Sequence, residues 1–365
     1  MSRNNVSIKS LGNEHKALAL ALCQLPCFSS LTVTNIRLIE SGLSQPCFEV
    51  GTVNQRYFAK YIADNYAEFA ASELASGYGM SPKVVYAGNK WLITEFIEAQ
   101  SLQQADLATN KKIALTLDLL MQCHQIDLDL VQVNSLMANV KSRAAGDLLS
   151  PLKAQQVEIS SLPVLNIATV INALLQQLNP NHFQHQQIAL FSEHLQQKLS
   201  RLVAQQSTDI KKVLCHGDAN FSNVLVTNNG GLSKNSFHGV LIDFECACLA
   251  PAEYDLAMMM AVNRIQANEV QEICQHYLLH LAWLKNQNTS STSDETANKK
   301  QINPVSLSID LVTCYRELSI LINFLWYFVE YQARKQLDYK NLAIEQLQLL
   351  AHGYPELHNL VLEMR

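Results

Sequence analysis

Three oxygen-bearing side chains in the sequence have the types and spacing of a site for metal and phosphate. Asp218 and Asn223 lie five positions apart in VLCHGDANFSNVLV, residues 213–226, and Asp243 follows in GVLIDFE. Carboxylate and amide oxygens are hard ligands, which suit Mg²⁺ rather than zinc. Asn223 and Asp243 can hold Mg²⁺ on phosphate oxygens while Asp218 accepts the proton of an attacking hydroxyl. The pattern therefore predicts phosphoryl transfer.

Short apolar runs stand next to each of these side chains and are typical of buried strands. The runs are VLC before the loop, VLV after it and VLI before Asp243. We expect hairpin-like strands to bring Asp218, Asn223 and Asp243 to one edge, around a single magnesium-bound nucleotide.

The residues up to position 98 have strand patterns that one helical pattern interrupts. The segment 67–79 is rich in Ala and Glu and predicts a helix, whereas the pattern beyond Ser101 is mainly helical. The sequence thus predicts an α+β protein with a small β-rich part and a large helical part. The predicted strands of the small part are 31–40, 47–53, 56–62, 83–88 and 90–97.

HGDANFSN followed by LIDFE resembles the catalytic and metal loops of the aminoglycoside phosphotransferase and choline/thiamine kinase superfamily. The resemblance implies a bilobal, protein-kinase-like fold that uses ATP and Mg²⁺. Residues 1–98 would be the ATP-clamping lobe, with a small antiparallel sheet. Residues 99–365 would be the helical lobe with the catalytic loop, the metal loop and the acceptor pocket. A protein kinase matches less well, because the loop lacks an Arg before Asp218 and Glu245 replaces the usual Gly after Asp-Phe.

A lysine on a strand is needed near the nucleotide phosphates, and RYFAKYI provides Lys60. An unpaired ammonium in this apolar context would be costly, so a carboxylate partner is expected. Glu68 and Glu73 are both candidates. The spacing to Pro82 favours Glu68 by resemblance to the family, and Glu73 stays open.

The resemblance also places two backbone segments at the nucleotide. The turn SGLS, with Gly42 and Ser44, would hold phosphate oxygens through N–H groups and hydroxyls. The segment from Glu95 to Ile97 would offer backbone groups to adenine. His216 and Asp255 would support the catalytic loop without reacting, and His124 is expected to be a buried structural histidine.

The C-terminal segment CYRELSILINFLWYFVEYQARKQ carries the candidates for acceptor binding. Aromatic faces and carboxylates attract organic cations such as choline or thiamine. The alternative is that these aromatic residues belong to the core. Glu245 favours the choline/thiamine-like branch, because Asp-Phe-Glu is typical of it. The candidates are Glu245, Trp326, Tyr327, Glu330 and Tyr331.

The composition excludes several other classes of protein. A net charge of −5 and a pI near 6.1 disfavour nucleic acid or an anionic membrane as partner. The nine cysteines lack metal-type spacing and are expected to be reduced thiols in the cytoplasm. The N-terminus predicts no secretory signal, and the longest apolar run, 318–329, is too short to span a membrane. The polar segment 285–303 predicts a solvated loop, and no obligate protein partner is evident.

The sequence therefore predicts a kinase that phosphorylates a hydroxyl of a small cationic metabolite. Two alternatives stay open: an aminoglycoside-type antibiotic phosphotransferase, and a nucleotide-binding regulator of the same fold without turnover. The presence of Lys60, Asp218, Asn223 and Asp243 argues against the second.

Overall fold

The structure is a computed structural model that describes residues 7–8, 12–39, 45–63, 65–128, 162–178, 184–206, 210–228, 237–289 and 307–365. The chain forms two compact units. The first unit comprises Met1–Leu107, Gln125–Pro163 and Ser222–Ala247, and the second comprises Ala108–His124, Val164–Phe221 and Cys248–Arg365. The predicted division of the chain into lobes at residue 98 stays a prediction.

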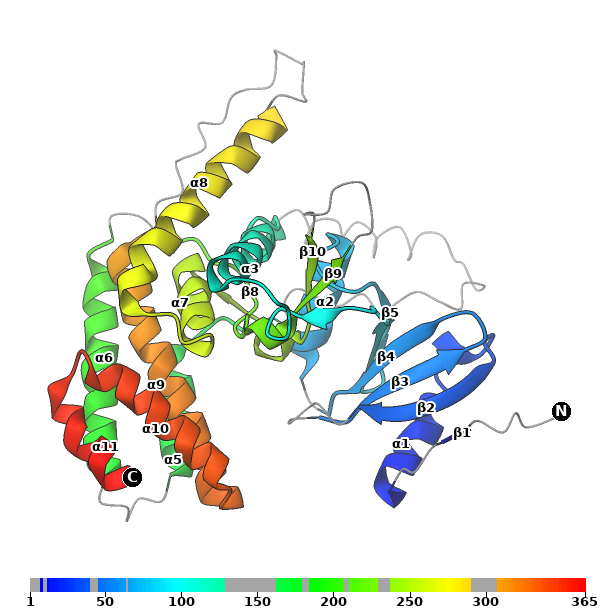
Figure 1. Ribbon diagram of the computed structural model, residues 1–365, viewed down its shortest axis with the longest axis horizontal. Helices are drawn as coiled ribbons and strands as arrows, with labels where there is room; N and C mark the ends of the chain where they lie inside the picture. The colour runs from blue at the N-terminus through cyan, green and yellow to red at the C-terminus, as the bar shows by residue number, and fades with distance from the viewer. Residues whose placement is uncertain are drawn as a thin grey trace, which may run out of the picture. The chain divides into compact units, whose positions relative to one another are not determined.

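A six-stranded sheet is the centre of the first unit, with the strand order β1-β2-β3-β4-β6-β5. Neighbouring strands from β2 onward are antiparallel, and only β1 pairs in parallel. The five predicted strands therefore form as β2 to β6, with boundaries that shift by at most two residues, and β1 was not predicted. The strands are β1 (Ser7–Ile8), β2 (Val33–Ile39), β3 (Cys47–Thr52), β4 (Arg56–Tyr61), β5 (Val84–Gly88) and β6 (Trp91–Glu95) (Figure 1).

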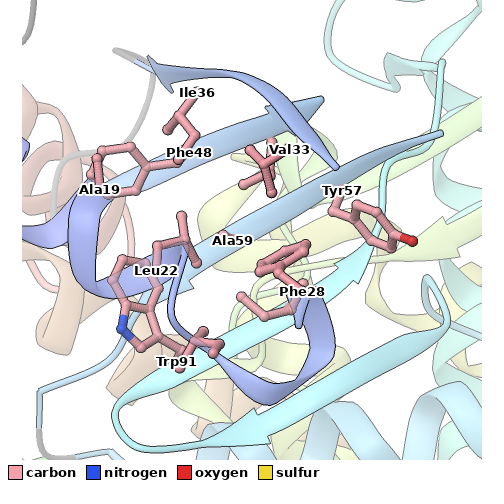
Figure 2. Packing of buried hydrophobic residues seen from close by; sticks show 12 residues of the cluster. Ala19, Leu22, Phe28, Val33, Ile36, Phe48, Tyr57, Ala59 and Trp91 are labelled. Carbon is pink, nitrogen blue, oxygen red and sulfur yellow. The ribbon is translucent and has the colours of Figure 1, made fainter. Parts of the chain in front are cut away.

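Helices cover both faces of this sheet. Side chains of α1 (Asn13–Leu22) pack with Ala59 and Ile93 on one face, in the core cluster shown in Figure 2. Leu92 packs with Phe69 of α2 (Tyr66–Gly77) in a separate cluster. Because neighbouring side chains of a strand point to opposite faces, Leu92 and Ile93 place α1 and α2 on opposite faces. Lys60, next to Ala59, consequently faces the side of α2.

A second, three-stranded sheet of the first unit contains the strands around Asp243. Its order is β10-β9-β7, with β7 (Gln100–Ser101), β9 (Val224–Asn228) and β10 (Phe237–Leu241). The hairpin-like strands expected next to Asp243 are β9 and β10, which pair in antiparallel order. β8 (Val213–Cys215), in the second unit, pairs with β11 (Cys248–Ala250). An apolar run specifies burial but not its partner strand, so the sequence left this pairing undetermined.

The second unit is mainly helical (Figure 1). Its central helix is α7 (Ala252–Val262), in which every residue from Ala252 to Ala261 is buried. A helix that is buried on all sides must be surrounded by protein, and α9 is one of its neighbours. The other helices are α3 (Thr109–His124), α5 (Ile167–Gln177), α6 (His185–Ala204), α8 (Val270–Thr289), α9 (Ile309–Arg334), α10 (Leu337–Ala351) and α11 (His358–Met364).

Two further predictions from the sequence can be compared with these helices. The apolar run 318–329 lies within α9 and is largely buried, as expected. None of the helices in the described residues is long and apolar enough to cross a membrane. The predicted loop 285–303 is wrong at its start, because α8 continues to Thr289. Residues 290–303 lie outside the described residues.

Candidate functional site

Lys60 is the centre of an ion cluster in the first unit. Its Nζ lies 2.5 Å from Asp243 Oδ1, 2.8 Å from Glu68 Oε1 and 3.2 Å from Glu245 Oε2. The Lys60 and Glu68 side chains are only 6% and 1% exposed, whereas Asp243 and Glu245 are 34% and 28% exposed. The cluster therefore has a buried end at Glu68 and a more open end at the two other carboxylates.

The backbone explains why these groups meet. Lys60 lies on β4 opposite Cys47 of β3 and Leu92 of β6, so the sheet fixes its position on both sides. Glu68 is in the first turn of α2, where the helix dipole favours a negative charge.

Asp243 follows β10 in a left-handed backbone conformation, with φ 66° and ψ 67°. This conformation is uncommon for residues other than glycine, although Asp tolerates it better than most. Such backbone strain is concentrated at functional sites. Asn65 Nδ2 donates to the Glu245 carbonyl at 2.8 Å, which ties the turn after Asp243 to the start of α2.

The carboxylates around Lys60 favour its charged form. Burial would lower the pKa of Lys60, but the charges of Asp243, Glu68 and Glu245 outweigh it and raise the pKa above its usual value. Burial raises the pKa of Glu68, and the charge and hydrogen bond of Lys60 act against that rise. Removal of the ammonium would therefore leave a buried carboxylate without compensation.

The carboxylate partner of Lys60 is Glu68, and this settles the alternative that the sequence left open. Glu73 is one and a half turns further along α2. Burial raises the pKa of Glu73 to about 7, without a contribution from Lys60.

Asn223 and Asp243, the two predicted metal ligands, belong to the same unit and are linked through the backbone. The Ile242 N–H donates to the Asn223 carbonyl at 2.9 Å, next to the register pair Leu241 and Val224. The two side chains thus leave adjacent strand ends, as the sequence predicted for this pair.

The three carboxylates around Lys60 are oxygen donors of the type that binds a hard divalent cation. Glu68, Asp243 and Glu245 each offer a carboxylate oxygen within 4.8 Å of the others. Glu68 Oε2 is buried and accepts no hydrogen bond from the described residues. Hard oxygen donors of this kind are the ligands that Mg²⁺ prefers.

The other predicted nucleotide contacts are only partly described. Gly42 and Ser44 lie outside the described residues. Glu95 ends β6, its N–H donates to the Lys83 carbonyl at 2.9 Å, and the Phe96 N–H donates to the Arg56 carbonyl at 3.1 Å. These bonds fix the segment that leads to Ile97.

The loop that carries Asp218 lies in the second unit, after β8. Asp255 of α7 accepts hydrogen bonds from the N–H groups of His216 and Gly217, both at 2.9 Å. Gly217 has φ 76°, which glycine adopts without strain. The Asp218 N–H in turn donates to His216 Nδ1 at 3.3 Å. Asp255 and His216 are thus placed at the backbone of the loop.

Asp255 is buried and remains a carboxylate. Burial would raise its pKa, but hydrogen bonds and charge from His124, together with His216 and the Gly217 N–H, outweigh burial and lower the pKa. His124 Nε2 lies 3.0 Å from Asp255 Oδ2, and His124 Nδ1 lies 2.8 Å from the Tyr277 hydroxyl. His124 is therefore a buried, hydrogen-bonded histidine, as expected. Sequence patterns gave no signal for Tyr277.

Asn263 is a second residue that the sequence analysis missed. Its Oδ1 accepts from the Phe221 N–H at 2.9 Å, and its Nδ2 donates to the Ala219 carbonyl at 3.0 Å. Asn263 directly follows α7, and no motif in the sequence linked it to the loop.

The aromatic candidates all lie on α9 in the second unit, but they differ in surroundings. Trp326 is 41% exposed, and its ring meets Tyr327 edge to face at 5.2 Å. Glu330 pairs with Arg334 at 2.5 Å. Lys335 Nζ lies 5.8 Å from the centre of the Tyr331 ring. Glu330 and Tyr331 thus already contact cations of the chain.

Among the candidates for acceptor binding, Tyr327 is the one whose pKa is affected by the charge of Asp218. Burial raises the pKa of the Tyr327 phenol, and the negative charge of Asp218 adds to this rise. Arg264, which pairs with Glu345 at 2.6 Å, acts in the opposite direction. Glu245, the remaining candidate, belongs to the Lys60 cluster of the first unit.

One family of enzymes and several solved structures are similar to this chain. The model of the phosphotransferase enzyme family matches residues 35–286, which is more than half of the chain. No curated protein matches. Choline kinase LicA from Streptococcus pneumoniae is 15% identical, with a TM-score of 0.59, over 93% of this chain and 100% of that chain.

Two other solved structures show the same likeness. A choline/ethanolamine kinase family protein from Mesorhizobium loti is 14% identical, with a TM-score of 0.57, over 96% and 99% of the two chains. The GDP and kanamycin complex of APH(2")-IIia is 15% identical, with a TM-score of 0.52, over 92% and 98%. These likenesses confirm the predicted α+β, kinase-like fold class.

Proposed function

The chain belongs to the phosphotransferase enzyme family and is a small-molecule kinase, and we propose that it transfers the γ-phosphoryl group of ATP to a hydroxyl of a small organic cation such as choline or thiamine. The observation that carries the proposal is the placement of Lys60 Nζ between Glu68 and Asp243. This arrangement joins a strand lysine, a helix carboxylate and the Asp of the metal loop. A lysine–glutamate pair and a metal-binding Asp are the recurring parts of kinase nucleotide sites.

Lys60 binds the nucleotide phosphates in this proposal, and Glu68 keeps the lysine charged and oriented. Gly42, Ser44 and the backbone from Glu95 to Ile97 are proposed as further contacts to ATP. Asn223 and Asp243 would hold Mg²⁺, which would bind phosphate oxygens and neutralise their charge.

Asp218 is the proposed catalytic base. It orients the acceptor hydroxyl and takes its proton as the oxygen attacks the γ-phosphorus and the bond to the β-phosphate oxygen breaks. Asp255 and His216 hold the backbone on the N-terminal side of Asp218. They are supporting residues, because their contacts are to the loop itself.

A cationic acceptor is supported by the surroundings of Asp218. Tyr327 is close enough for the Asp218 charge to raise its pKa, and Trp326 packs on Tyr327. Aromatic faces near a carboxylate attract organic cations through cation–π and charge interactions. Solved choline kinases among the structural neighbours, one of them in complex with AMP, also favour this class of acceptor and an adenine nucleotide.

A substrate panel tests the proposal. Purified protein is incubated with ATP and Mg²⁺ and with choline, thiamine, ethanolamine or kanamycin, and ADP release is measured. We expect turnover with at least one of the first three acceptors, and we expect Asp218→Asn to lose about 10²- to 10⁴-fold in kcat. The variant should still bind a fluorescent ATP analogue. Turnover with kanamycin alone would favour the antibiotic phosphotransferase, and nucleotide binding without any turnover would favour the regulator.

A further inference from the structure

The loop with the proposed base contacts a second polar side chain at the C-terminal end of α7. Asn263 is the residue that follows α7, and its amide group faces the loop with both of its ends. Oδ1 accepts from the Phe221 N–H at 2.9 Å, and Nδ2 donates to the Ala219 carbonyl at 3.0 Å and to the Met259 carbonyl at 2.8 Å. The side chain thus forms hydrogen bonds with its own helix and with the loop.

Asp255 and Asn263 hold opposite sides of Asp218. Asp255 accepts from the two residues before Asp218, and Asn263 contacts the residue directly after it and Phe221 beyond. The two side chains are eight positions apart on α7, which corresponds to about 12 Å along a helix axis. The backbone on each side of the proposed base is therefore fixed to one helix.

The helix is suited to this task because it is rigid. Every residue from Ala252 to Ala261 is buried, and close-packed interiors resist displacement. Beyond Asn263, Arg264 has a left-handed φ of 57°, and the Ile265 carbonyl accepts from the buried Arg316 guanidinium at 2.8 and 3.2 Å. The segment around Asn263 is thus fixed on both sides.

We propose that Asn263 is a positioning residue that holds the Asp218 carboxylate in its productive geometry. The inference rests on the proposed function, since it takes Asp218 as the base. Asn263 does not touch substrate in this role, and it acts through the backbone of the loop. A displacement of a reacting group by about 1 Å can cost on the order of 10²-fold in rate.

Two variants and one matched control test the role. Asn263→Ala removes both loop contacts, whereas Asn263→Asp keeps an acceptor for the Phe221 N–H and loses the donor to the Ala219 carbonyl. Asn166→Ala is the control, because Asn166 also accepts a backbone hydrogen bond in the second unit, from the Thr169 N–H at the start of α5. We expect Asn263→Ala to lower kcat by about 10- to 100-fold with KM for ATP within twofold. Asn166→Ala should lower Tm but leave kcat unchanged.

Hydrogen exchange of the loop gives a readout that does not need turnover. We expect the Phe221 amide to exchange faster in Asn263→Ala than in the wild type, and to stay slow in Asn263→Asp and Asn166→Ala. Unchanged exchange in Asn263→Ala, or a kcat within twofold of the wild type, would overturn the proposal. If the wild type phosphorylates none of the acceptors, the proposed function fails, and exchange alone then decides whether Asn263 holds the loop.

Discussion

Lys60 Nζ lies 2.5 Å from Asp243 Oδ1, although 183 positions separate the two residues in the chain. The same ammonium contacts Glu68 and Glu245, so one cation faces three carboxylates. The pair connects β4 of the large sheet to the turn after β10. Since each carboxylate of the cluster depends on this charge, Lys60 is the residue whose loss should have the widest effect.

Replacement of Lys60 by Met should reduce phosphoryl transfer strongly. The variant keeps the length of the side chain but removes the charge that we assign to the nucleotide phosphates. Loss of one such electrostatic contact commonly costs about 10²- to 10³-fold in rate. We expect a loss of this size in kcat/KM for ATP, measured by ADP release.

Lys111→Met is the matched control, because Lys111 is exposed on α3. It should change kcat/KM for ATP by less than twofold. Equal activity of Lys60→Met and Lys111→Met would contradict the assignment of Lys60 to the nucleotide.

Much of the first unit follows from the sequence, since its strands alternate in a simple antiparallel order. The runs around Lys60 and Trp91 predicted β4 and β6 because β-branched and aromatic residues pack well on a pleated sheet. The partner of β8 could not be predicted in this way. Its three residues are buried throughout, so no alternation specifies which neighbour they pair with.

The residues of the candidate site also differ in whether the sequence could predict them. Residues in short motifs, such as Asp218 and Asp255, were found because their spacing along the chain is itself the signal. Asn263 was missed, since its partners lie about forty positions away. The contacts of Glu330 with Arg334 and of Tyr331 with Lys335 were also not considered, although Arg334 is one turn from Glu330.

Glu73 should make the folded protein less stable as the pH rises, and Glu73→Gln should remove this dependence. Burial raises the pKa of Glu73 to about 7 in the folded protein, against about 4.3 in an unfolded chain. The folded state therefore binds the proton more tightly, and stability is lost as the pH rises from about 4.3 through 7. We expect Glu73→Gln to raise Tm relative to the wild type at pH 8 but not at pH 4, by thermal unfolding. The same Tm difference at both pH values would contradict the assignment.

Asp255→Asn should destabilise the protein at neutral pH. The amide can no longer accept from two backbone N–H groups and His124 as a carboxylate does, and breaking a buried charged contact costs about 3–5 kcal/mol. Because the pKa of Asp255 is lowered on folding, its contribution is present above pH 4 and lost as the pH falls further. Urea unfolding at pH 7 and pH 3 measures this, with the exposed Asp106→Asn as control. An equal loss at both pH values would argue against a charged Asp255.

Tyr327 should determine the affinity for the acceptor through its ring rather than its hydroxyl. If the acceptor is an organic cation, the aromatic face supplies the attraction, worth about 0.5–2 kcal/mol. Tyr327→Phe keeps the face and should change KM for the acceptor by less than threefold. Tyr327→Leu removes the face and should raise that KM by about 2- to 30-fold.

The KM for ATP separates acceptor binding from a general loss of structure. It should stay within twofold in both Tyr327 variants and in Tyr78→Leu, a control at a tyrosine that is 54% exposed. A Tyr327→Phe variant as impaired as Tyr327→Leu would show that the hydroxyl is the essential group. A hydroxyl near Asp218 would then act as a hydrogen-bond donor, and a neutral or anionic acceptor would account for the site better than a cation.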